Sequence, residues 1–128
     1  MNQLYPTIKD LMLTKRFDWL TDDIRLTLWD DGPVFDPTHT DISQIGGVKL
    51  ATSPTLSGRR VITQMACTAA IHFARLTTPD DVHIALLHRE TDGRLIAFLD
   101  DISGFDFQGT GGDYIFTPNG PSGAIFKL

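Results

Sequence analysis

Four aspartates bracket one predicted strand, and they are the first residues in this chain whose chemistry could make a site. Asp22 and Asp23 precede the strand, while Asp30 and Asp31 follow it. Carboxylates can ligate a hard cation or work as a general acid and base. However, a strand of this length spans about 20 Å, so the two pairs cannot share one ion. The calcium-loop pattern is absent too, which favours turn-forming, solvated carboxylates.

The four histidines are not spaced for a metal site. None of them recurs at i and i+4, and His83 and His88 point to opposite faces of one predicted strand. Cys67 lies among alanines, where a small buried thiol is the ordinary outcome. The sequence also has no nucleophile elbow and no phosphate-binding loop. We therefore expect no metal, no cofactor and no catalytic residue, and we interpret the chain as a protein that is not an enzyme.

Several aromatic residues fall in or beside predicted loops. Phe35 lies in one loop, Phe105 and Phe107 lie in another, and Trp19 and Trp29 flank the strand described above. Aromatic side chains exposed in loops could stack on sugars or anchor a protein interface. They could equally pack beneath their own loops, and the sequence leaves both interpretations open.

Size and charge narrow the classes of partner. The 128 residues include sixteen acidic and eleven basic side chains, which give a net charge of −5. The longest Lys/Arg run is Arg59-Arg60, whereas nucleic acids and anionic membranes need a concentrated basic face. The single Cys67 excludes an internal disulfide, and we expect neither a signal peptide nor a membrane-spanning run. We expect one domain over residues 1–128, made in a reducing cytoplasm.

The segment 81–101 predicts the element around which the chain is organised. Two apolar runs, 82–88 and 95–99, flank Asp92-Gly93, which can take the positive φ angles of a tight hairpin turn. Both faces of each run are apolar, as expected of strands in the middle of a layered β protein. The rest of the chain must therefore cover this hairpin on both sides.

The remaining pattern is mainly β with one short helix. Apolar residues recur at helical spacing after Pro6 and predict a helix over 5–15. A half-buried strand over 24–29 leads into a long excursion over 33–47 with one helical turn at 40–45. Further strands are expected over 48–52, 61–65, 70–76, 114–116 and 124–128. The pattern predicts a single-domain β-sandwich or small barrel of about seven antiparallel strands, with a short N-terminal helix.

Several short motifs follow one another in a distinctive order. Leu4-Tyr5 precedes the Ile-x-Leu-x-Leu strand at 24–28, and His39 precedes Asp41-Ile42 in the excursion. The segment 48–56 is followed by Ser57-Gly58. The order ends with Gly111-Gly112-Asp113 at a strand start and with Asn119-Gly120 before Ile125-Phe126-Lys127-Leu128. In this order the chain resembles small structural proteins encoded by tailed bacteriophages. Arg59 replaces their usual lysine, 65–74 is richer in alanine, and 117–119 departs from their strand and turn.

The resemblance implies a virion component made in the host cytoplasm, first of all a capsid decoration or cement protein. Such a protein binds the major capsid protein lattice and stabilises the head, with no catalytic residue to carry over. It is expected to self-associate, a trimer being the first choice because capsid lattices offer threefold positions. The residues that we expect at its contact surface lie in the two long loops: Phe35, His39, Asp41, Ile42, Phe105 and Phe107.

Three alternatives remain. A tail, neck, baseplate or fibre-associated structural protein would share the same fold. A carbohydrate-binding β-sandwich would need Trp19 or Trp29 exposed on a flat face. A hydrolase is the least favoured and would depend on Asp36, His39 and Cys67.

Overall fold

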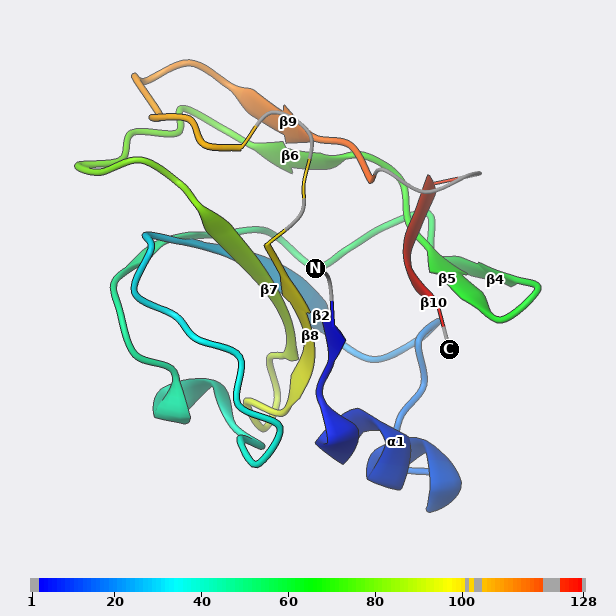
Figure 1. Cartoon of the computed structure of the whole chain (residues 1–128). Helices are drawn as coiled ribbons and strands as arrows, with labels where there is room; N and C mark the ends of the chain where they lie inside the picture. The colour runs from blue at the N-terminus through cyan, green and yellow to red at the C-terminus, as the bar shows by residue number, and fades with distance from the viewer. Residues whose placement is uncertain (1–2, 101, 103–104, 119–122, 128) are drawn as a thin grey trace.

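The β7–β8 hairpin lies within the largest sheet, as the sequence predicted (Figure 1). In the computed structural model, which describes residues 3–100, 102, 105–118 and 123–127, β7 (Ile84–Arg89) and β8 (Leu95–Leu99) are antiparallel neighbours. Gly93 in the connecting turn has a φ of +74°. Every residue of both strands is buried. The predicted hairpin, its turn and its burial on both faces are confirmed.

This hairpin belongs to a five-stranded antiparallel sheet in the order β1-β8-β7-β2-β3. The other members are β1 (Gln3–Leu4), β2 (Ile24–Trp29) and β3 (Lys49–Thr52). A bulge in β8, opposite β7, places Ile96 and Ala97 on the same side of the sheet. β3 forms one edge, as predicted for the strand that ends before Pro54.

β2 is more buried than the sequence predicted. Its apolar residues Ile24, Leu26 and Leu28 face one side, as expected, but Thr27 and Trp29 on the other side are buried as well. The prediction of a half-buried strand was therefore wrong. The physical reason is that the excursion over 33–47 covers the second face, which the alternation of residues in β2 alone cannot reveal.

Two smaller antiparallel sheets pack against one face of the large sheet (Figure 1). The three-stranded sheet has the order β10 (Ala124–Lys127), β5 (Met65–Cys67), β4 (Arg60–Ile62). The two-stranded sheet pairs β6 (Ile71–Phe73) with β9 (Tyr114–Phe116). Their inward side chains join those of the large sheet in one core, which includes Leu26, Leu28, Ala66, Phe73, Leu87, Phe116 and Ile125. The predicted class, a mainly β chain resembling a small β-sandwich, is confirmed, and the strands of the described residues form three sheets that do not close into one barrel.

The helix α1 (Pro6–Leu13) lies beside β8 and contributes Ile8 to the same core. Pro6 occupies the first turn, where its missing N–H costs no hydrogen bond. The helix ends where the Thr14 hydroxyl donates to the carbonyl oxygen of Asp10 at 2.9 Å and Lys15 takes a φ of +58°. The predicted N-terminal helix is confirmed, two residues shorter at its end. No helix in the described part of the chain is long and apolar enough to cross a bilayer.

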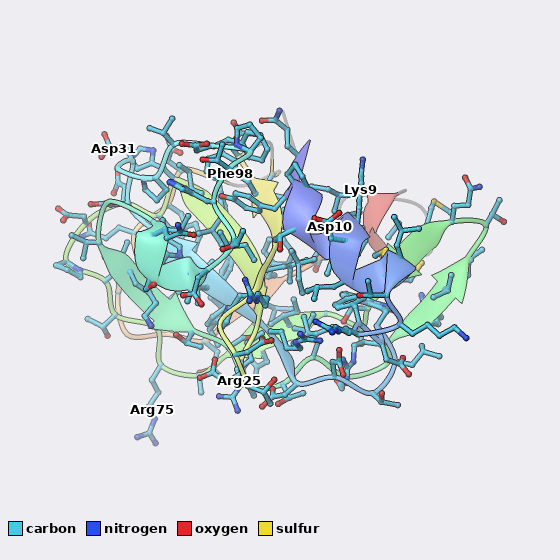
Figure 2. All side chains as sticks on the ribbon, turned by 90° about the horizontal axis from the view of Figure 1, so that it is seen from below. Lys9, Asp10, Arg25, Asp31, Arg75 and Phe98 are labelled. Carbon is cyan, nitrogen blue, oxygen red and sulfur yellow. The ribbon has the colours of Figure 1, made fainter. Side chains whose placement is uncertain are left out.

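The excursion over 33–47 covers the other face of the large sheet. Phe35, Ile42 and Ile45 pack against a second core formed by residues such as Leu86 and Phe98. The predicted helical turn is present as a short 3-10 helix, η1 (Ile42–Gln44). Figure 2 shows Phe98 on the side of this excursion, away from the helix. The two faces of the sheet are thus closed by different segments of the chain.

The segment 60–67 folds as a hairpin where one extended segment was expected. β4 and β5 are joined by Thr63 and Gln64, whose φ angles are +45° and +66°. Neither residue is a typical hairpin-turn residue, so the turn left no signal in the sequence. Likewise the strand expected over 70–76 is restricted to β6, because Arg75 takes a φ of +50°. The described residues form ten strands, more than the seven or so expected.

Candidate functional site

The residues expected at a contact surface lie on opposite faces of the large sheet. Phe35 belongs to the excursion, where its ring lies 5.0 Å from Tyr5 and 5.9 Å from Phe98, centroid to centroid. Phe105 and Phe107 lie on the other face, within the larger core. The structure therefore does not bring the two groups together, and each is held by its own neighbours.

Asp41 and Ile42 hold the excursion to the central hairpin. The Asp41 carboxylate accepts a hydrogen bond from the Ser43 backbone N–H at 2.9 Å and caps η1. The Ile42 backbone N–H donates to the carbonyl oxygen of Gly93 at 2.8 Å, and Asp41 forms a β-bridge with Arg94. These two residues thus extend the sheet beside β8 and close part of its edge.

His39 is half-buried next to Asp36. Its Nε2 lies 3.7 Å from Asp36 Oδ2, and its buried Nδ1 has no hydrogen-bond partner among the described residues. Hydrogen bonds from the hydroxyl and the backbone N–H of Thr38 hold the pKa of Asp36 below its usual value. Burial, and then the negative charge of Asp36, raise the pKa of Tyr5 to about 12. This corner is a packed polar rim.

Phe105 and Phe107 pack under their own loop. Phe107 stacks on Tyr114 at 4.2 Å, and Phe105 lies 5.5 Å from Phe107 and 6.3 Å from Phe116. Phe107 also forms a β-bridge with Val82, two residues before β7. Both rings are half-buried. Of the two interpretations left open for the loop aromatics, packing onto the core matches their positions.

A shallow acidic depression opens at the end of β2. Asp30 and Asp31 follow β2, and Asp80 and Asp81 precede β7, its antiparallel neighbour. Together with Pro79, His83 and Gln108 they line a volume of about 490 Å³. Sequence reasoning missed this grouping because it did not predict that β2 and β7 are neighbours, and this pairing is what brings the two aspartate pairs together. Figure 2 shows Asp31 at one end of the molecule.

Asp30 and His83 in this depression already have partners. Asp30 Oδ1 accepts hydrogen bonds from the backbone N–H groups of Val48 and Gly32, both at 3.0 Å, and these bonds lower the pKa of Asp30. His83 Nδ1 lies 2.8 Å from Asp106 Oδ1. A carboxylate–imidazole pair can move a proton, but no serine, threonine, cysteine or lysine side chain is among the lining residues. The described residues also contain no group of three or more side chains placed to hold a metal ion.

The other aspartate pair, at the start of β2, binds arginines. Arg89 is buried, and its guanidinium lies 3.0 Å from Asp22 and 2.7 Å from Asp92. Asp23 pairs with Arg25 at 3.1 Å. The two ends of β2 therefore carry separate clusters, as the strand length required. Asp22 and Asp23 are half-buried, which distinguishes them from the solvated residues that were expected.

Both tryptophans and the cysteine are buried. Trp19 is 6% exposed, and its indole N–H donates to the carbonyl oxygens of Arg60 at 3.2 Å and Cys67 at 3.1 Å. Trp29 is 5% exposed and donates to the Thr27 hydroxyl at 2.7 Å. Cys67 has no exposed surface. Neither ring offers the flat face that a carbohydrate site needs, and the thiol is closed to substrates.

The β4–β5 hairpin presents apolar side chains to solvent. It projects from the body in Figure 1, and Figure 2 shows it at the end opposite Asp31. All three residues of β4 are exposed, with Val61 at 58% and Ile62 at 37%. Exposed apolar side chains gathered on a projecting element are typical of protein contact surfaces. Sequence reasoning missed this surface because it did not detect the turn at Thr63-Gln64.

Known proteins give no guide to the site. Family models, characterised proteins and solved structures were all compared with this chain, and none of them matches. The motif Asn119-Gly120 and the terminal Leu128, on which part of the sequence resemblance rests, lie outside the described residues. The function is therefore argued from the sequence pattern and from the β4–β5 surface.

Proposed function

We propose that this chain is a structural, non-catalytic component of a tailed-phage particle, a capsid decoration or cement protein that binds the major capsid protein lattice. The proposal starts from the order of motifs along the sequence. The observation that carries it furthest is the β4–β5 hairpin, which presents Val61 and Ile62 to a neighbour from the end of a sealed β core. The contact surface proposed thus moves from the loop aromatics to this hairpin.

The construction of the core supports this role. Both faces of the large sheet are covered, and the edge of β8 is closed by β1 and by the segment around Asp41. A protein that reinforces joints between subunits needs a body that does not deform under load, together with projecting elements that reach its neighbours. Many weak contacts then add up through multivalent attachment.

A tail, neck, baseplate or fibre-associated role is the second candidate, since it would use the same body and the same hairpin. The experiment that tests both incubates the purified protein with empty capsid shells and, separately, with isolated tails. Sedimentation with shells supports the decoration role, and sedimentation with tails alone supports the second candidate. If neither particle carries the protein down at near-physiological salt, the virion proposal fails.

The carbohydrate-binding alternative can be tested in parallel. Because Trp19 and Trp29 are buried and already donate hydrogen bonds, we expect no change in tryptophan fluorescence when host polysaccharide is added at millimolar sugar concentration. A saturable change in fluorescence would contradict this expectation and revive the alternative.

A further inference from the structure

The outer edge of β4 is open. β4 is the last strand of its sheet, and within the described residues it pairs with β5 alone. Its three residues are exposed, and the side chains of Val61 and Ile62 are apolar. An open strand edge presents unpaired backbone N–H and C=O groups, which form a template for pairing with another chain.

The turn at Thr63-Gln64 determines which backbone groups face that edge. In a hairpin with a two-residue turn, the flanking pair, here Ile62 and Met65, exchanges both backbone hydrogen bonds. Bonded and non-bonded pairs then alternate, so the Val61–Ala66 pair is not bonded. The N–H and C=O of Val61 therefore point outward, to the open side.

The contact made by Trp19 agrees with this register. Its indole N–H lies within 3.2 Å of the carbonyl oxygens of both Arg60 and Cys67. One donor can reach both oxygens when they lie together between the strands, as they do in a hydrogen-bonded pair. Arg60 and Cys67 are opposite each other in the hairpin, so the next residue, Val61, belongs to the outward-facing set.

The edge strand β3 of the large sheet is protected in more ways than β4. β3 carries the exposed Lys49, has an irregular register with β2, and is followed closely by Pro54. Charged residues, register irregularities and prolines are the common means of preventing edge-to-edge pairing. β4 carries the charged Arg60, but it has a regular register with β5 and contains neither proline nor bulge. Its edge is therefore ready to pair.

We propose that two copies of this chain join through their β4 strands, antiparallel, about a two-fold axis at Val61. The chain's own charges select this register. With the axis at Val61, Arg60 faces Ile62 of the partner subunit and Arg59 faces Thr63 of the partner subunit. An axis at Arg59, the preceding outward-facing residue, would set two arginines directly opposite each other, which is unfavourable. The axis at Val61 also buries the exposed apolar side chain against its own copy.

This inference uses the same β4–β5 hairpin as the virion proposal, and a Val61 side chain buried on the dimer axis is not available to a capsid protein, but the two proposals are tested by different measurements. Edge pairing about a two-fold axis predicts a dimer, which differs from the trimer that the phage resemblance suggests. The protein can therefore dimerise through β4 and still fail to bind capsid shells, or bind shells as a monomer. The two experiments can fail separately.

Sedimentation equilibrium of the full chain, over a hundredfold range of concentration, tests the proposal. We expect a monomer–dimer equilibrium for the natural sequence. Val61→Pro removes the outward N–H, which the hairpin itself does not use, and Val61→Lys places a charge on the axis. Each should weaken dimerisation by tenfold or more while circular dichroism stays unchanged. Val34→Lys, which alters another exposed valine on the excursion, should leave dimerisation intact.

A cysteine placed at the axis gives an independent measurement. Directly opposed residues of a hydrogen-bonded antiparallel pair lie about 5.5 Å apart between α-carbons, a separation that a disulfide can span. Val61→Cys should therefore form a reducible, cross-linked dimer under mild oxidation, while the buried Cys67 should not react. Val34→Cys is the control, since Val34 is the more exposed valine, at 73%.

Four outcomes would overturn the proposal. They are a monomer at every concentration, a trimer, a dimer that survives both Val61→Pro and Val61→Lys, and cross-linking of Val34→Cys as fast as that of Val61→Cys. Val61→Pro acts on the backbone and Val61→Lys acts through charge. If one of these variants does not fold, the other still tests whether the dimer forms through β4.

Discussion

The carboxylate of Asp41 lies against the α-carbon of Gly93. A Cβ atom on Gly93 would stand 2.9 Å from Asp41 Oδ2, and the residue has a φ of +74°. The turn of the central hairpin and the excursion that covers its outer face are therefore fitted to each other. Glycine is required at this position both for the backbone conformation and for the close approach.

We expect Gly93→Ala to destabilise the fold by about 1–3 kcal/mol, because it combines left-handed strain with displacement of Asp41. Urea unfolding followed by circular dichroism measures the change. Gly46→Ala is the matched control in the same excursion, since nothing lies within 4 Å of a Cβ there and its φ is not positive. Equal losses in the two variants would contradict this account.

Trp19 should hold the β4–β5 hairpin to the body. Trp19→Phe keeps an aromatic ring near Phe126 but loses the donor to Arg60 and Cys67, at a cost of about 1–2 kcal/mol. Hydrogen exchange should become faster in residues 60–67. Trp29→Phe, which also loses one buried donor, should leave exchange in that segment unchanged.

The bidentate contact between Arg89 and Asp92 should require a guanidinium. Arg89 Nε and Nη2 donate to the two carboxylate oxygens of Asp92 at 3.0 and 2.7 Å, and Nη1 donates to Asp22 at 3.0 Å. Lysine keeps the charge but cannot make this fork, so Arg89→Lys should cost about 1–3 kcal/mol. Arg25→Lys, at the more exposed pair with Asp23, should cost less in the same unfolding assay.

Acid should weaken the contact between Arg89 and Asp92. The hydrogen bonds from Arg89 lower the pKa of Asp92 in the folded protein below its unfolded value of 3.8. Its contribution to stability is therefore present above pH 3.8 and is lost as the pH falls through the lower, folded pKa. In Asp92→Asn, unfolding free energy measured from pH 6 to pH 2 should fall less steeply. A curve parallel to that of the natural sequence would contradict this assignment.

Local patterns predicted those elements whose signals lie within a few residues. Asp92-Gly93 marked the hairpin turn, and the two-faced apolar runs on either side marked a buried position. Thr63-Gln64 gave no such signal, because its left-handed turn is imposed by the pairing of β4 with β5. The hairpin that became the candidate surface was missed for this reason.

Contacts between distant segments account for the rest. The acidic depression forms because β2 and β7 are neighbours, which places Asp30 near Asp81. Whether Phe107 faces solvent or Tyr114 depends on the bridge between Val82 and Phe107, and no pattern within the loop encodes that bridge. Residue types alone therefore indicated which side chains could form contacts, while topology decided which of them do.

The closure of β8 by β1 and by the segment around Asp41 has a consequence for synthesis of the protein. β1, β2 and the excursion all lie in the first third of the chain or just beyond it, yet they pair with residues of β7 and β8. When these early segments leave the ribosome, their partners have not yet been translated. β2 can pair with β3 early, but β1 and the segment around Asp41 must wait until the β8 hairpin has emerged, and during that interval the nascent chain needs protection from aggregation.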